Sequence, residues 1–245
     1  MGGFGPVHRF YRNDHKSGPG HVFRVQVEQT DLWVRADTDL SRQTHDLVLT
    51  YRRQILQYGR MVPAFLTSLV PLPEDRLAPE IVRRMFQAGL QAQVGPMAAV
   101  AGAIAQAVAE GLLPWTTSVI VENGGDCYAV AKEDLVVAVY PGENSPFRNR
   151  LALKLTAEDL PMAVCTSSGT FGHSLSFGRA DAATVLAKDA ALADACATAL
   201  GNRIQHPDDL ERALAWIQFV PGVLGALAVV QDRLAAWGHI VLTAP

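Results

Sequence analysis

Residues 182–200 read AATVLAKDAALADACATAL, and this stretch decides the fold of the chain. The six residues at 182–187 are apolar or β-branched and have charged neighbours on both sides, which predicts a buried strand. Asp189 is a good N-cap for a helix over 190–200, and Gly201 is a typical helix end.

The helix at 190–200 carries two polar side chains in apolar surroundings. Eight of the twelve residues from 189 to 200 are Ala or Leu, which predicts a helix buried almost all round. Asp194 and Thr198 are four residues apart and share one face of it. A buried carboxylate must be neutralised, paired or bound to metal. Carboxylate and hydroxyl oxygens are ligands of the kind Mg²⁺ takes, so Asp194 and Thr198 are candidate metal ligands.

A second interpretation of the same two residues stays open. Asp194 could pair with a Lys or Arg, which would satisfy the buried charge without a metal. Thr198 would then donate its hydroxyl hydrogen to the carbonyl of residue 194, as Thr often does within helices. Spacing alone does not separate this structural interpretation from the metal site.

Outward from this stretch, short strands and separated helices predict an α+β fold with an antiparallel sheet and helices on its faces. We expect one domain over residues 1–245, or two closely packed lobes. A strand pair that turns at Thr30–Asp31 and a closing hairpin at the C-terminus are part of this prediction. The expected strands cover 21–36 as a pair, 118–122, 127–131, 135–140, 149–155, 164–168, 182–187, 224–230 and 240–242. The expected helices cover 41–58 (N-cap Ser41, ended by Gly59), 80–91, 94–112, 190–200 and 207–217, with a loop at 63–73.

Composition excludes several classes of function. The formal net charge is −3 and the pI is about 6.1, so no strong positive field is available for nucleic acid. Three cysteines outside any C-x-x-C pair fit a reducing cytoplasm. The N-terminus lacks the apolar core of a signal peptide, and the longest apolar run, 94–115, suits a packed helix better than a membrane span. We therefore expect a cytoplasmic protein without nucleic-acid or membrane partners. The small residues of 95–109 could also form a homo-oligomer face.

Two glycine-containing segments are candidate ligand-binding loops. The segment 122–126 reads ENGGD and follows a predicted strand, and its glycines allow positive φ and close approach to a ligand. A tight hairpin turn is a compatible interpretation, because Asn-Gly is a strong hairpin signal. Gly95 precedes a proline at a helix start, where free N–H groups could receive an anion. The candidate ligand-binding residues here are Gly95, Asn123, Gly124, Gly125 and Asp126.

A third polar segment, CTSSGTFGHS at 165–174, is dense in hydroxyls and glycine. Such a loop can bind phosphate or place a nucleophile, and His173 could act as acid or base near neutral pH. We therefore take Ser168 and His173 as catalytic candidates. A Gly-x-Ser-x-Gly elbow is absent, so a hydrolase triad is not predicted, and a polar turn between strands is the alternative. The candidate ligand-binding residues of this segment are Thr166, Ser167 and Gly169.

Taken together, these motifs resemble an uncharacterised bacterial and archaeal family related to the ApbE flavin transferases. The resemblance covers nearly the whole chain and rests on VGPMAAVAGAIA at 94–105, VENGGDCYA at 121–129, TSSGTFGHS at 166–174, ALADACATA at 191–199 and EQTDL at 28–32. It implies an α+β fold with a deep flavin cleft. The transferases split FAD with Mg²⁺ and attach FMN to a Ser or Thr of a partner protein. Their Asp-x-x-x-Thr helix supplies metal ligands, which Asp194 and Thr198 match.

One departure from the transferases bears on function. Their long stretch ending in Asp-Pro-x-Thr-Gly is missing, and His173 follows Ser168 within a few residues. The prediction is therefore a Mg²⁺-dependent protein that binds FAD or another phosphate-containing nucleotide, acting as a transferase or a pyrophosphate-cleaving enzyme. One alternative is a role in sulfur metabolism through a reactive Cys165. Another is a non-catalytic scaffold with Asp194 in a buried ion pair.

Overall fold

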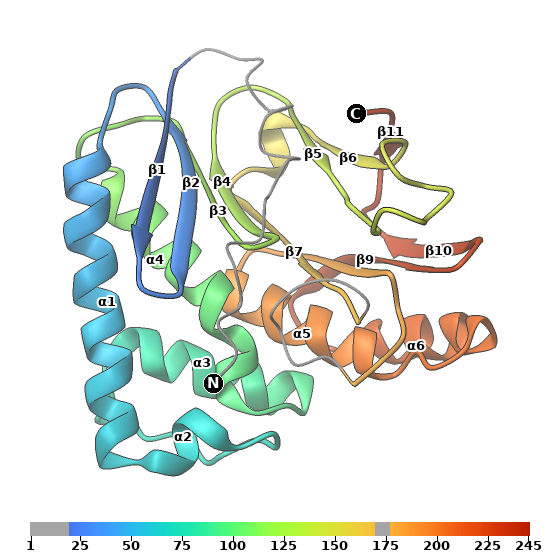
Figure 1. The fold of residues 1–245 in the computed structure, drawn as a ribbon, viewed down its shortest axis with the longest axis horizontal. Coiled ribbons are helices and arrows are strands. Elements are labelled where there is room, and N and C mark those ends of the chain that lie inside the picture. Colours follow the sequence, from blue (N-terminus) through green and yellow to red (C-terminus); the bar gives the residue numbers. More distant parts are fainter. Residues whose placement is uncertain (1–19, 170–176) are drawn as a thin grey trace.

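The computed structural model describes residues 20–169 and 177–245, and its centre is an eight-stranded antiparallel sheet (Figure 1). The strand order is β1-β2-β3-β4-β7-β8-β9-β10. The strands of this sheet are β1 (His21–Val27), β2 (Thr30–Ala36), β3 (Val119–Asn123), β4 (Asp126–Val130), β7 (Met162–Ser167), β8 (Ala182–Ala187), β9 (Val223–Val230) and β10 (Arg233–Gly238). Most neighbours in the sheet are successive strands, and the α-helices lie in the β2–β3 and β8–β9 connections.

The helices form a layer on one face of this sheet (Figure 1). The long elements are α1 (Ser41–Met61), α3 (Glu80–Ala92), α4 (Val100–Leu112), α5 (Ala190–Asn202) and α6 (Leu210–Ile217); shorter turns are α2 (Pro63–Thr67), η2 (Pro96–Ala99), η3 (Ala157–Asp159) and η4 (Pro207–Asp209). Their apolar sides and the inward side chains of the sheet make one large core. The predicted α+β class is confirmed, and the helices cover one face.

A small second sheet covers part of the other face. It contains β5 (Leu135–Ala138), β6 (Ala152–Leu155) and β11 (Leu242–Thr243) in the order β11-β6-β5. Leu153 and Leu155 from this sheet pack with Met162 and Leu227 of the large sheet in a second core. The central strands are therefore buried on both faces, which explains the continuous apolar run at β8.

Several predicted boundaries are wrong. Thr30 and Asp31 are the first residues of β2, so the turn of the strand pair lies before them. Ser41 is the first residue of α1, not its N-cap, and Gly201 lies inside α5.

Gly59 does not end α1; it lies inside the helix, where an added Cβ would come within 2.4 Å of the Leu66 side chain. The predicted loop at 63–73 begins with α2, because a proline at the first helical position needs no hydrogen bond for its missing N–H. The C-terminal strand at 242–243 pairs with β6, whereas β9 pairs with β10.

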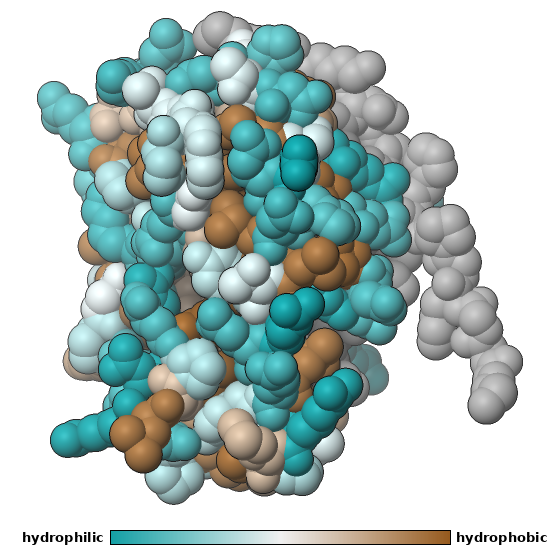
Figure 2. Space-filling view, turned by 90° about the vertical axis from the view of Figure 1, so that its left-hand side faces the viewer, coloured by the Kyte–Doolittle hydropathy of each residue, from teal (hydrophilic) through white to brown (hydrophobic). Residues whose placement is uncertain are grey.

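The outward side of α1 is exposed to solvent. Val48, Ile55 and Tyr58 point into the core at helical spacing. Figure 2 shows the face that carries α1 as mainly hydrophilic, with hydrophobic patches separated by polar surface. Within the two described ranges, no single helix has the length and hydropathy to cross a membrane. The α3 and η2–α4 segments reach that threshold only as a pair, with a bend of 107° between them.

A close backbone contact joins α4 and α5. Gly102 of α4 lies against the start of α5, and a Cβ added to it would be 2.2 Å from the carbonyl oxygen of Ala190. Small residues at 105 and 109 of the same helix are also fully buried within the chain. The small-residue stripe of α4 therefore serves packing inside this chain, and the oligomer face considered from sequence is already covered.

Substituting Gly102 tests this contact. Gly102→Ala would force the α4 and α5 backbones apart, and overpacking of this kind costs about 2 kcal/mol or more. Gly111→Ala on the same helix is the matched control, because its added Cβ would meet only the end of the Leu47 side chain at 2.9 Å. Urea unfolding should show a large loss in the free energy of unfolding for Gly102→Ala. The same quantity should change by no more than about 1 kcal/mol for Gly111→Ala. Equal losses would contradict the close contact.

Candidate functional site

Three polar side chains on the sheet point toward the helix layer. Asn123 ends β3, Asp126 begins β4, and the two are paired across their hairpin. Asp126 is also paired with Cys165 of β7, which lies in the helix-side core. Side chains alternate along a strand, so Ser167 faces the helices as Cys165 does. The structure thus brings together Asn123, Asp126 and Ser167 from predicted segments more than 40 residues apart.

The hairpin between β3 and β4 has the tight turn that its sequence predicts. Gly124 and Gly125 have φ of 73° and 114°, values that glycine adopts without strain. The N–H of Gly125 donates to Oε1 of Glu122 at 2.9 Å, so this N–H is already engaged. Nδ2 of Asn123 donates to the carbonyl oxygen of Ala101 at 3.1 Å. The hairpin is thereby tied to the first turn of α4.

Asp194 lies on α5 directly opposite that first turn. The N–H of Gly102 donates to Oδ2 of Asp194 at 2.8 Å. The first N–H groups of a helix have no partner within the helix, and they carry its partial positive charge. The Asp194 carboxylate is therefore an N-cap for α4, supplied by another helix. Oδ2 of Asp194 is held in this way.

The start of α5 is capped in turn by α4. The N–H of Ala190 donates to Oε1 of Gln106 at 2.7 Å, and Gln106 is itself held through its Nε2 by Glu110. The predicted N-cap is also confirmed, because Asp189 accepts a hydrogen bond from the N–H of Leu192 at 2.8 Å. Sequence reasoning missed Gln106. Its only signal is a polar side chain in an otherwise apolar helix.

The ion pair considered for Asp194 does not form among the described residues. No Lys or Arg in the described ranges lies within 4.0 Å of this carboxylate. Thr198, one turn further along α5 and equally buried, makes no hydrogen bond to the carbonyl of residue 194 there. Among the described residues, neither half of the structural alternative is present, and the N-terminus of α4 faces the carboxylate instead.

Two carboxylates share this buried region. Asp126 and Asp194 are only 7% and 8% exposed. Burial raises the pKa of Asp194 to about 7, although the N–H groups of Gly102 and Ala101 oppose the shift. Burial also raises the pKa of Asp126 well above its usual range, and the negative charge of Asp194 raises it further. Removing charge from this pair, by a proton or by a cation, is therefore favourable.

Unpartnered oxygens make the site suitable for a hard cation. Oδ1 of Asp126 and Oγ of Ser167 are both buried without a hydrogen-bond partner. A buried polar atom without a partner costs free energy unless a ligand satisfies it. Carboxylate and hydroxyl oxygens are the donors that Mg²⁺ prefers. The residues present therefore fit a divalent cation of this class.

Other predicted site residues lie elsewhere. Thr166 is on the opposite face of the sheet from Ser167, and its hydroxyl hydrogen-bonds that of Thr184 at 2.9 Å. The N–H of Gly95 donates to the carbonyl of Leu69 at 3.0 Å, so it is engaged in packing. Gly169 donates to the carbonyl of Ala180, and Ser168 directly follows β7. His173 lies outside the described residues, and its catalytic role stays a prediction.

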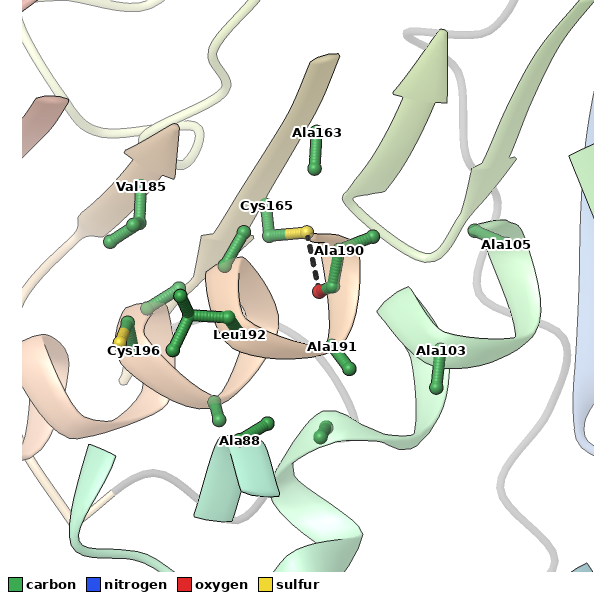
Figure 3. Close-up of a cluster of buried hydrophobic side chains, with 14 of the residues drawn as sticks. Ala88, Ala103, Ala105, Ala163, Cys165, Val185, Ala190, Ala191, Leu192 and Cys196 are labelled. Carbon is green, nitrogen blue, oxygen red and sulfur yellow. Dashed lines mark hydrogen bonds between the residues drawn. The ribbon is translucent and has the colours of Figure 1, made fainter. Parts of the chain in front are cut away.

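The thiol of Cys165 is buried in the core between the sheet and α5. Figure 3 shows its sulfur pointing at the carbonyl oxygen of Ala190, a contact of 3.6 Å. Burial raises the pKa of this thiol well above its usual range, and the nearby carboxylates of Asp126 and Asp194 raise it further. A protonated, inaccessible thiol is a poor nucleophile, so the burial of Cys165 disfavours the reactive-cysteine alternative.

The arrangement of layers is that of the ApbE fold. The chain superposes on the Pseudomonas stutzeri flavinyl transferase ApbE with a TM-score of 0.59, at 15% identity over 89% of this chain and 94% of that one. An ApbE protein from Thermotoga maritima gives a TM-score of 0.54 at 13% identity, over 88% and 96%. The fold thus defines an ApbE-like protein.

Sequence comparison identifies the family within that class. The family model described as "AbpE bacteria" matches residues 12–234. A UPF0280 protein of Methanocella arvoryzae is 38% identical over 218 residues, covering 89% of this chain and 88% of the relative. A UPF0280 protein of Methanopyrus kandleri is 41% identical over 214 residues, covering 86% of each. The chain belongs to this ApbE-like family of UPF0280 proteins, as its motifs predict.

The raised pKa of Asp194 predicts how stability changes with pH in the absence of metal. In the folded protein Asp194 keeps its proton up to about pH 7, whereas in the unfolded chain it ionises near 3.8. The free energy of unfolding should therefore fall as pH rises, by about 2–3 kcal/mol between about pH 5 and pH 8.

Chemical denaturation in EDTA measures this change. Asp194→Asn should flatten the slope, and Asp46→Asn, at an exposed site on α1, should leave it as in the wild type. An Asp194→Asn variant with the full wild-type slope would contradict this origin of the pH dependence.

The burial of the cysteines predicts low thiol reactivity. Cys127, Cys165 and Cys196 are all free and buried. A disulfide reagent should therefore modify the folded protein only slowly, and three equivalents should react rapidly after denaturation. Rapid modification of Cys165 in the folded protein, located by peptide mass spectrometry, would revive the sulfur-chemistry alternative.

Proposed function

We propose that this chain uses Asp194 and Thr198 to bind Mg²⁺ and, at that ion, the pyrophosphate of a flavin nucleotide such as FAD. The observation that carries the proposal is a buried carboxylate without a cationic partner among the described residues. It lies one helical turn from a hydroxyl, its charge acts on Asp126, and Oδ1 of Asp126 and Oγ of Ser167 are buried without a hydrogen-bond partner. A fold shared with proteins titled flavin transferases supports the choice of nucleotide.

The residues of the site have separable roles in this proposal. Asp194 supplies the anionic ligand, and the N–H of Gly102 holds its carboxylate in one orientation. Thr198 supplies a neutral oxygen on the same helix face. Asn123 fixes the first turn of α4, which keeps Gly102 in place. A bound Mg²⁺ would neutralise pyrophosphate charge and stabilise the leaving phosphate.

Two reactions are consistent with this ligand. One is hydrolysis of the pyrophosphate to FMN and AMP, and the other is transfer of FMN to a hydroxyl of a protein acceptor. Ser168 and His173 remain the predicted catalytic residues for either. A protein that binds the nucleotide without reaction is the third form of the proposal.

Binding of FAD with and without Mg²⁺ tests the proposal. Wild-type protein should quench flavin fluorescence when it binds FAD. The Kd for FAD should rise at least about tenfold when Mg²⁺ is removed. Asp194→Asn and Thr198→Val should show a similar loss in the presence of Mg²⁺. Thr198→Ser keeps the hydroxyl and is the matched control, which should bind nearly as the wild type does.

The same samples, analysed by chromatography for FMN and AMP, distinguish binding from cleavage. FAD binding that is insensitive to Mg²⁺ and to both substitutions would contradict the metal role. The absence of FAD binding under any of these conditions would leave Asp194 as a structural cap of α4 and end the proposal.

A further inference from the structure

We infer that Asp126 is a second carboxylate ligand of the same cation, and that Asp126, Asp194, Thr198 and Ser167 form an all-oxygen site able to load the cation before any nucleotide binds. This inference rests on the proposed function and deepens it. It assigns a direct ligand role to a residue on the sheet, across from the helix that carries the Asp-x-x-x-Thr pair.

The first argument is the state of the Asp126 side chain. It is only 7% exposed, and its Oδ1 has no hydrogen-bond partner. Ser167 lies on the neighbouring strand and on the same face of the sheet. Its Oγ is also buried without a hydrogen-bond partner. Two unsatisfied oxygens facing one helix layer indicate a missing partner that both can bind.

The second argument is charge. Asp126 and Asp194 are close enough to influence each other electrostatically, and neither forms an ion pair within the described parts of the chain. The N-terminus of α4 supplies about half a positive charge to Asp194, which does not balance two carboxylates. One divalent cation between them would balance both.

The third argument concerns the kind of cation. Cys165 is paired with Asp126 across the neighbouring strands, but its sulfur contacts the carbonyl oxygen of Ala190 at 3.6 Å. The remaining donors are carboxylate and hydroxyl oxygens. Such a set favours Mg²⁺ or Mn²⁺, whereas Zn²⁺ sites in proteins draw on Cys and His.

The test measures Mn²⁺ binding to the full chain without nucleotide. Binding is monitored by the decrease in the EPR signal of free Mn²⁺. Wild-type protein should bind about one Mn²⁺ that Mg²⁺ displaces. Asp126→Asn and Asp194→Asn should each raise the Kd at least about tenfold, and Ser167→Ala should raise it less. Asparagine keeps the shape of the side chain and removes a buried charge, so circular dichroism should show that both variants fold.

Glu122→Gln is the matched control for long-range electrostatics. Glu122 is on the same hairpin and its charge also acts on Asp126, but strand alternation places it on the opposite face of the sheet. Gln keeps the acceptor for the N–H of Gly125. We expect this variant to change the Mn²⁺ Kd by less than about twofold, as for a distant screened charge.

The outcomes separate this inference from the proposed function. Mn²⁺ affinity that falls in Asp194→Asn but changes in Asp126→Asn only as much as in Glu122→Gln overturns the ligand role of Asp126 and leaves the proposed function standing. Wild-type protein that binds no Mn²⁺ without FAD, yet binds FAD in a Mg²⁺-dependent way, also overturns only this inference. Affinity that is unchanged in Asp194→Asn overturns both.

Discussion

The contact between α4 and α5 is the constraint on which the rest of the helix layer depends. The backbones meet at Gly102 and Ala190, at a distance that excludes any side chain larger than hydrogen at residue 102. Each helix also satisfies the open N-terminus of the other, through Asp194 in one direction and Gln106 in the other. Because both caps are side chains, register and separation are fixed together, and neither helix can slide without exposing unpaired N–H groups.

This reciprocal capping also sets the electrostatics of the candidate site. The carboxylate of Asp194 is held where the first turn of α4 stabilises it, yet its pKa is still raised, because burial outweighs two backbone donors. Asp126 is brought opposite it by the β3–β4 hairpin, whose tip is tied to α4 through Asn123. The packing that orders the helices therefore also assembles a pair of negative groups without a compensating cation in the described structure.

Local patterns predicted most of the elements and part of the site. The β8–α5 stretch, the Asp189 cap and the glycine turn at 124–125 follow from short-range rules, and the structure confirms them. The partner of Asp194 could not be predicted, because it is a backbone N–H 92 residues away. The face occupied by Thr166 was missed for a related reason. Composition marks a polar loop, but only the strand register decides that Ser167 turns toward Asp126 and Thr166 away from it.

The capping role of Asp194 is compatible with its proposed role as a metal ligand. The N–H of Gly102 donates to Oδ2, and a hydrogen bond of this kind fixes the orientation of the carboxylate. Metal ligands are commonly oriented by an outer hydrogen bond of this kind. A purely structural cap would need no second carboxylate nearby, since Asp126 only adds repulsion to it. The buried pair is therefore costly for folding alone, and the proposed cation between its members would offset that cost.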